Sequence, residues 1–171
     1  SEERLVSIRT GEAIAEACNQ LGYITSKFVL DSDSIDLILK DLKTHDFVFI
    51  ALHGSFGEDG VIQSILSKNN IPFNGSNEES SRNCFNKSVT KDIVMNQGIL
   101  SPKYYHTSSN ICNDHIDFNS EKYIVKPNSQ GSSVGFNVVD NFENLNDAID
   151  IALDFDTSVL IEEFIDGREI T

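Results

Sequence analysis

Hydrophobic residues in the first half of the chain follow helical and extended patterns in turn. Apolar positions recur every three or four residues in the helical segments, whereas 46–52 is an almost continuous apolar run. Such a run is typical of a strand buried on both faces of a parallel sheet. The predicted helices and strands alternate along the chain: 10–21, 23–30, 35–42, 46–52, 61–69 and, as a short strand, 71–73. This alternation predicts an α/β domain with an open parallel sheet and crossover connections.

The pattern changes in the second half. A helical stretch covers 77–98, and we expect it to break at Ser88 or Thr90. A polar segment at 106–120 predicts a surface loop. The remaining elements are strands at 122–126 and 134–139, a helix at 141–155 and a strand at 158–165. These elements predict a small α+β domain.

We expect a domain boundary between residues 76 and 84. The predicted division is 1–80 for an N-terminal α/β domain, 81–166 for the second domain and 167–171 for the start of a third. The first helix has no strand before it, and the last strand needs further partners. We therefore expect the chain to be a fragment of a longer protein.

Composition narrows the classes of function. The 171 residues are 39% hydrophobic and 23% charged, which is ordinary for a globular protein. The net charge of -14 argues against nucleic-acid binding by the whole surface, so a phosphate site must be a local group of amides and lysines. No apolar run is long enough for a transmembrane helix, and no secretory leader is recognisable. Cys18, Cys84 and Cys112 lack metal-ligand spacing, which favours reduced thiols in a cytosolic protein.

The most informative stretch is "YIVKPNSQGSSVGFNVV", residues 123–139. It is not a P-loop, because Lys126 precedes the turn and a strand, rather than a helix, follows it. The amides of a hairpin rich in glycine and serine can still bind an anion, helped here by Gly131, Ser132 and Ser133. Composition alone slightly favours a mobile polar hairpin. The position of Lys126, at the end of an apolar strand, shifts the interpretation towards a phosphate site.

A second cluster is "HGSFGEDG", residues 53–60, which directly follows the predicted strand 46–52. Ligands of open α/β sheets bind beyond the carboxyl ends of the strands. His53, Glu58 and Asp59 are therefore candidates for a polar substrate pocket. The alternative is a glycine-rich turn in which Asp59 caps the next helix, and one histidine with two carboxylates is weak evidence for a metal site.

Two further clusters carry charge. "NKSVTK" places Lys87 and Lys91 on one helix face, where the usual interpretation is two solvated lysines. "IEEFIDGRE" places Glu162 and Glu163 at the end of a strand. Because strand side chains alternate, only one of these carboxylates can point into a cleft. The other is expected to be solvated, or to meet a ribose or an exposed amine.

In this order the clusters resemble the D-alanine–D-alanine ligase family of ATP-grasp enzymes. The matching stretches are "SEERLVS", "ALHGSFGEDGVIQ", "IPFNGS", "NKSVTK", "GILSP", "YIVKPNSQGSSVG" and "VLIEEFIDGREIT". The resemblance runs essentially from residue 1 to residue 171. It implies a Rossmann-like open parallel sheet in the N-terminal domain, then an α+β ATP-grasp central domain, with the C-terminal ATP-grasp half absent from this chain.

The resemblance also implies a reaction. The family joins two D-alanines for peptidoglycan synthesis, using ATP and magnesium, or manganese in its place. The carboxylate of the first D-alanine attacks the γ-phosphate and becomes an acyl phosphate, and the amine of the second then displaces phosphate. This chemistry depends on positioning and charge neutralisation more than on a protein nucleophile. The enzyme is expected to be a cytoplasmic homodimer that acts on small molecules, without nucleic acid and without membrane insertion.

Residue roles follow at positions that match the family's motifs. Glu3 would hold the ammonium of the first D-alanine, His53 would lie near its carboxylate, and Glu58 would orient the loop. Ser132 would contact both substrate and nucleotide, so Glu3 and Ser132 are the expected catalytic residues. The expected nucleotide-binding residues are Lys87 and Lys126 at the phosphates, Gly131, Ser132, Ser133 and Val134 in a mobile lid, Glu162, Glu163 and Ile165 along the adenine, and Glu169 near the ribose.

The chain also departs from the family pattern. Leu5 stands where the opening motif usually has a second glutamate, which removes a supporting ion pair. The magnesium carboxylates, an arginine and the second D-alanine site are expected beyond Thr171, so the chain alone is expected to be inactive. Two alternatives stay open: a related ligase with a different second substrate, such as D-lactate, or a non-catalytic nucleotide-binding remnant.

Overall fold

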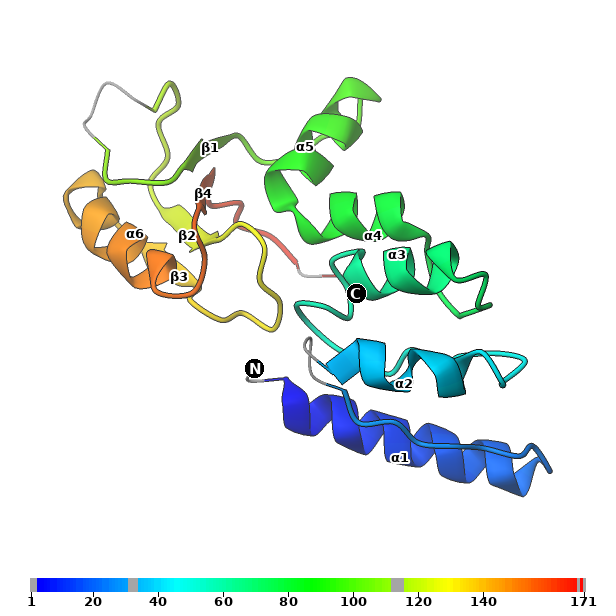
Figure 1. The fold of residues 1–171 in the computed structure, drawn as a ribbon. Helices are drawn as coiled ribbons and strands as arrows, with labels where there is room; N and C mark the ends of the chain where they lie inside the picture. The colour runs from blue at the N-terminus through cyan, green and yellow to red at the C-terminus, as the bar shows by residue number, and fades with distance from the viewer. Residues whose placement is uncertain (1–2, 31–33, 112–115, 169, 171) are drawn as a thin grey trace. The chain divides into compact units, whose positions relative to one another are not determined.

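The computed structural model describes all residues except 1–2, 31–33, 112–115, 169 and 171 (Figure 1). The chain divides into two compact units, Ser1–Cys84 and Phe85–Thr171. Each unit has its own hydrophobic core, and the two are described separately below. Among the described residues, no helix combines the length and apolar character needed to span a bilayer.

The described residues of the first unit form four α-helices. These are α1 (Arg4–Gln20), α2 (Ile35–Leu42), α3 (Val61–Lys68) and α4 (Glu78–Phe85), the last of which ends at the unit boundary. The apolar stripe of α3 places Ile62 and Leu66 in the core, where Leu66 is completely buried. Ile35 and Leu42 of α2 pack in the same cluster. Helical periodicity therefore located α2 and α3 correctly.

The predicted parallel sheet of this unit is represented by a single parallel bridge, between Val48 and Phe73. Val48 N donates to Pro72 O at 2.8 Å. The segments 23–30 and 46–52 have no other ladder in the described part of the chain, and both line a hollow of about 1200 Å³. A strand is stabilised by the amides and carbonyls of its neighbours, which these two segments do not offer each other. The prediction of two paired strands there is therefore wrong for this structure.

Two helix boundaries also differ from the predictions. Helix α1 begins at Arg4, not at Thr10, so Thr10 lies inside the helix. The predicted helix 77–98 breaks at Asn86, not at Ser88 or Thr90. The Asn86 side chain accepts a hydrogen bond from Val89 N and caps the second helix, because its carboxamide supplies an acceptor to a helix N–H that would otherwise lack one.

The second unit is a four-stranded antiparallel sheet in the order β1-β4-β2-β3. The strands are β1 (Tyr104–Thr107), β2 (Tyr123–Pro127), β3 (Asn137–Val139) and β4 (Val159–Glu163). The sheet is accompanied by α5 (Lys87–Asn96), the 3-10 turn η3 (Phe142–Asn144) and α6 (Leu145–Leu153). Strand β1 is an addition to the prediction, since part of it falls in the segment 106–120 expected to be a loop. The predicted hairpin of two strands around the glycine- and serine-rich loop is confirmed.

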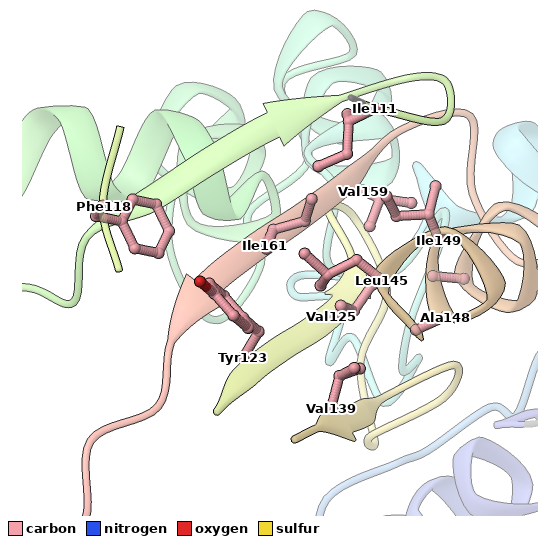
Figure 2. Packing of buried hydrophobic residues seen from close by; sticks show 11 residues of the cluster. Ile111, Phe118, Tyr123, Val125, Val139, Leu145, Ala148, Ile149, Val159 and Ile161 are labelled. Carbon is pink, nitrogen blue, oxygen red and sulfur yellow. The ribbon is translucent and has the colours of Figure 1, made fainter. Parts of the chain in front are cut away.

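One face of this sheet packs against α6 (Figure 2). Val125 and Ile161, from the two central strands, point towards Leu145 and Ile149 of the helix, and all four side chains are completely buried. Alternation along the strands sends every second side chain to this core. The intervening residues, Lys126 and Glu162 among them, are consequently directed to the opposite face.

We expect Ile149→Ala to destabilise the second unit. The substitution removes a fully buried side chain, which typically costs roughly 2–5 kcal/mol of unfolding free energy. Ile151→Ala is the matched control, because Ile151 lies on the same helix and is 48% exposed. Chemical denaturation of the chain measures both, and equal losses for the two variants would contradict the packing described here.

Candidate functional site

A buried group of charges lies on the sheet of the second unit. Glu162 is 4% exposed, and its strand β4 lies between β1 and β2. Its Oε1 lies 2.7 Å from Lys91 Nζ, and its Oε2 lies 2.5 Å from Lys126 Nζ. Lys91 comes from α5 and Lys126 from β2, so one carboxylate joins a helix to the neighbouring strand. The expectation of solvated lysines is wrong for Lys91, which is only 8% exposed.

Lys91 makes further contacts in this group. Its Nζ donates to Ser101 Oγ at 2.8 Å and to Pro102 O at 3.0 Å, and it lies 5.3 Å from the centroid of the Tyr104 ring. The Tyr104 hydroxyl donates to Asp92. Burial and this hydrogen bond raise the pKa of Tyr104 to about 12. The phenol therefore remains protonated throughout the physiological range.

The base of the hairpin loop is held by a buried amide. Asn128, 2% exposed, accepts from Ser88 N at 2.9 Å through Oδ1 and donates from Nδ2 to Asn86 Oδ1 at 3.0 Å. The Asn128 carbonyl accepts from Lys87 N at 3.0 Å. The start of the loop is thus fastened to the N-terminal turn of α5, which carries Lys87.

The other side of the base is held by Asp156. Its Oδ2 accepts from Ser129 N at 2.5 Å, and Gln130 Nε2 donates to Phe155 O at 2.9 Å. Gly135, with a φ of +66°, closes the loop so tightly that a Cβ there would lie 2.8 Å from Pro127 Cγ. The loop therefore leaves and re-enters the sheet at fixed points.

The tip of the loop contains the residues expected to form the lid. Ser132 and Ser133 are exposed and adopt left-handed backbone conformations, with φ values of +52° and +57°. The backbone turns are closed by Val134 N to Gly131 O at 3.2 Å and by Phe136 N to Ser133 O at 3.3 Å. These two hydroxyl-bearing residues stand in exposed positions at the end of a firmly held base.

Lys87 faces this loop. Its Nζ donates to Gln130 O at 2.5 Å and to Asn128 O at 3.3 Å. Burial and the neighbouring charge of Lys126 lower the pKa of Lys87 below its ordinary value of 10.5, while Asp156 and Glu162 act in the opposite direction. Both effects that lower the pKa would be offset by an anion bound between the two ammonium groups.

Glu163 and Ile165, which were also predicted for the nucleotide, lie at the end of β4 and shortly after it. Glu163 is half-buried, and its Oε1 accepts an exposed hydrogen bond from Lys103 N at 2.8 Å. Ile165 is 60% exposed. Glu169 lies outside the described residues.

The first unit brings the other predicted residues together. The Glu3 carboxylate lies against Gly54, where an added Cβ would be 1.9 Å from Glu3 Oε2. The adjoining His53 lies 3.3 Å from both Thr10 Oγ1, through Nε2, and Glu58 Oε1, through Nδ1. Glu58 Oε2 also accepts from Gly54 N at 2.9 Å, which is the loop-orienting contact expected of this residue. The geometry assembles an imidazole and two carboxylates beside the N-terminal end of α1.

Asp59 has the capping role that was the alternative interpretation of this loop. Its Oδ2 accepts from Phe56 N at 2.7 Å and its Oδ1 from Val61 N at 3.0 Å. Both acceptors are thereby used to fix the turn that leads into α3. Asp59 is consequently a structural residue of the loop 53–60. The polar cluster beside this loop consists of His53, Glu58 and Glu3.

Sequence reasoning missed Asn86, Asn128 and Asp156, which fix the phosphate-loop candidate. Asparagine and aspartate are common in turns, so their presence beside a glycine- and serine-rich segment was not distinctive. The available signal was the asparagine directly after Pro127, where an apolar strand ends. Its almost complete burial could not be read from composition.

We expect Gly54→Ala to lower the stability of the first unit more than Gly75→Ala does. Both glycines have left-handed backbones, with φ values of +72° and +88°, so alanine is strained at each by roughly 1–2 kcal/mol. Only at Gly54 does the new methyl group collide with Glu3, whereas nothing lies within 4 Å at Gly75. Thermal unfolding measures the difference, which should vanish when Glu3 is replaced by alanine. An equal loss for both variants with Glu3 present would contradict this prediction.

We expect the Lys87 amine to react with an acylating reagent at lower pH in the folded chain than in the chain unfolded by urea. The lowered pKa leaves more free amine on Lys87 at any pH below 10.5. The measurement is competitive labelling across a pH series, read by mass spectrometry, with the labelling of Lys87 in each state normalised to its own maximum. A Lys87 midpoint in the folded chain at or above that in the unfolded chain would contradict the burial of this ammonium group.

Comparisons with known proteins show which proteins the chain resembles in sequence and in fold. A curated D-alanine–D-alanine ligase of Clostridium perfringens strain SM101 is 39% identical over 176 residues, covering 100% of this chain and 57% of the relative. The chain therefore spans little more than half the length of such relatives. The structure of the Bacillus anthracis D-alanine–D-alanine ligase complexed with ATP matches with a TM-score of 0.85 at 31% identity, covering 98% of this chain and 56% of the other.

The VanG D-Ala:D-Ser ligase of Enterococcus faecalis also matches, with a TM-score of 0.65 and 34% identity over 71% of this chain and 37% of that one. Two family models match as well: the one described as "D-ala D-ala ligase N-terminus" at residues 32–76 and the one described as "D-ala D-ala ligase C-terminus" at residues 91–171. Together they cover more than half of the chain. An α/β fold, an ordered set of motifs and both family models thus agree, and the chain belongs to the D-alanine–D-alanine ligase family.

Proposed function

We propose that the chain is part of an ATP-dependent ligase that joins two D-alanines through an acyl phosphate. The observation that carries this proposal is the hairpin loop of the second unit, whose base holds two lysines from different elements. Lys126 is the last residue but one of β2, and Lys87 begins α5. The Lys87 ammonium donates to Gln130 O in the loop, and the charge of Lys126 is near enough to lower the pKa of Lys87. Two cations and such a loop suit a polyphosphate tail.

In this proposal the second unit binds the nucleotide. Lys87 and Lys126 neutralise phosphate oxygens, and Gly131, Ser132, Ser133 and Val134 fold over them as a lid. Glu162, Glu163 and Ile165 line the adenine, with Glu169 near the ribose. The firmly held base and exposed tip of the loop support a lid that moves while its ends stay in place. Ser132 is proposed to contact the substrate as well as the nucleotide.

The first unit is proposed to bind the first D-alanine. The Glu3 carboxylate would receive the ammonium group of the amino acid, and His53 would lie near its carboxylate. The contact of Glu3 with Gly54 and the contact of His53 with Glu58 support this assignment. In the reaction, the substrate carboxylate attacks the γ-phosphate, ADP leaves, and the amine of the second D-alanine then displaces phosphate from the acyl carbon.

The finer features of the architecture belong to the same proposal. We propose domains at 1–80 and 81–166, with 167–171 beginning a third, a Rossmann-like N-terminal domain and an ATP-grasp central domain. Within the described residues, no three His, Cys, Asp or Glu side chains are arranged so that they could hold a metal ion, and no step is assigned to magnesium. A homodimer in the cytoplasm, where ATP is available, completes the proposal.

A related specificity is the second candidate. The match to a D-Ala:D-Ser ligase shows that similar chains occur in enzymes with another second substrate. The roles proposed for Lys87, Lys126 and Glu3 are the same in both cases. Comparing D-alanine, D-serine and D-lactate as acceptors over a pH range separates the two candidates.

The decisive experiment uses the complete product of the gene. We expect ATP-dependent phosphate release that requires D-alanine, with D-alanyl-D-alanine as the product detected by mass spectrometry. Nucleotide binding without phosphate release would instead favour the non-catalytic remnant. Failure to bind ATP at all would refute both interpretations.

Lys126→Ala should lower kcat/KM for ATP in the same protein. Loss of a charge-assisted phosphate contact is worth roughly 1.5–3 kcal/mol, or about ten- to 150-fold in kcat/KM. Lys122→Ala is the control, since Lys122 is another lysine of the second unit and has an exposed side chain that pairs with Asp140 at 3.4 Å. An unchanged kcat/KM in Lys126→Ala would remove Lys126 from the site.

A further inference from the structure

Lys91 is a buried cation to which the proposed reaction assigns no role. Its ammonium group has three N–H donors, and all three have partners: Glu162, Ser101 and Pro102. The distances are 2.7, 2.8 and 3.0 Å in that order. With every donor used inside the protein, Lys91 is not placed to bind a ligand directly.

The carboxylate of Glu162 connects Lys91 to the proposed phosphate site. One of its oxygens meets Lys91 and the other meets Lys126. The Lys126 side chain is 24% exposed, whereas that of Lys91 is 10% exposed, so Lys126 is the member of the pair that can reach a ligand. Glu162 thus lies between Lys91, whose three N–H donors all have partners within the protein, and Lys126, which is exposed enough to reach a ligand.

The charge balance depends on Lys91. A buried carboxylate requires compensation, because desolvation of the unpaired charge is costly. If Lys91 lost its charge, Lys126 would remain as the partner of Glu162 and would be held by both oxygens. A phosphate would then compete for the Lys126 ammonium group with a carboxylate that has no other cation.

We propose that Lys91 is a positioning residue for nucleotide binding. Its ammonium group occupies one oxygen of Glu162, which orients the carboxylate and leaves Lys126 free to neutralise a phosphate. The inference rests on the proposed use of ATP and extends it to a residue that does not touch the nucleotide.

The test is Lys91→Met in the complete gene product, with steady-state kinetics in ATP and in D-alanine. We expect KM for ATP to rise by about tenfold or more, as for a weakened charge-assisted contact, while KM for D-alanine is unchanged. Lys91→Arg, which keeps the charge, should restore part of the affinity, and Lys122→Met should have no effect. A residue with only a structural role would reduce the active fraction, lowering the apparent kcat and leaving KM for ATP unaltered.

The second arm repeats Lys91→Met in a Lys126→Ala background. Because the effect acts through Lys126, it should be largely lost there, and an equal rise of KM for ATP in both backgrounds would overturn the inference. If Lys91→Met does not fold, Lys91→Gln takes its place, since an amide can donate to Ser101 and Pro102 without carrying charge. A wild-type protein that releases no phosphate refutes the proposed function, whereas an active wild type with an unaltered Lys91 variant refutes this inference alone.

Discussion

The second unit depends on the ion pairs that the buried carboxylate of Glu162 forms with Lys91 and Lys126. A carboxylate at 4% exposure is tolerated only when cations and hydrogen-bond donors replace the water it has lost. Lys91 from α5 and Lys126 from β2 provide that compensation. The helix that carries Lys87 is thereby tied to the sheet that carries the hairpin. One electrostatic requirement accordingly sets the positions of three lysines.

The hairpin combines a rigid base with an exposed tip. Asn128 and Asp156 hold the base through hydrogen bonds to side chains and backbone on both sides, and Gly135 admits the close approach of Pro127. Ser132 and Ser133 lie beyond these anchors. A loop of this kind can change conformation at its tip without displacing its ends. The proposed phosphate site therefore keeps its lysines in place while the lid responds to a ligand.

Local patterns accounted for the second unit better than for the first. Apolar alternation and the glycine- and serine-rich turn identified the hairpin, and helical periodicity identified α6, because their contacts are mostly between neighbours in sequence. Lys91 was misread because two lysines four residues apart are usually solvated. Its burial depends on Glu162, which lies far along the chain. The same holds for Asn128, whose partner Asn86 belongs to another element.

Pairing explains the error in the first unit. The run 46–52 has the composition of a buried strand, yet composition expresses only the tendency to be extended and covered. A ladder needs a second backbone at the right distance, and in the described residues only Phe73 provides one, to Val48. The sequence of the segment 23–30 does not indicate whether another backbone segment lies close enough to form hydrogen bonds with it. Strand propensity thus predicted an extended backbone correctly, but it did not predict which segments form a hydrogen-bonded ladder.

Local charge, rather than total charge, governs the proposed phosphate site. The chain carries a net charge of -14, which disfavours extended polyanions over most of its surface. At the hairpin, however, Lys87 and Lys126 lie close enough for one charge to lower the pKa of the other. Their mutual repulsion is relieved when an anion lies between them, so binding of phosphate favours the protonated form of Lys87. A small, highly charged ligand that fits within the loop gains this relief, whereas a long polymer would also meet the acidic surface around it.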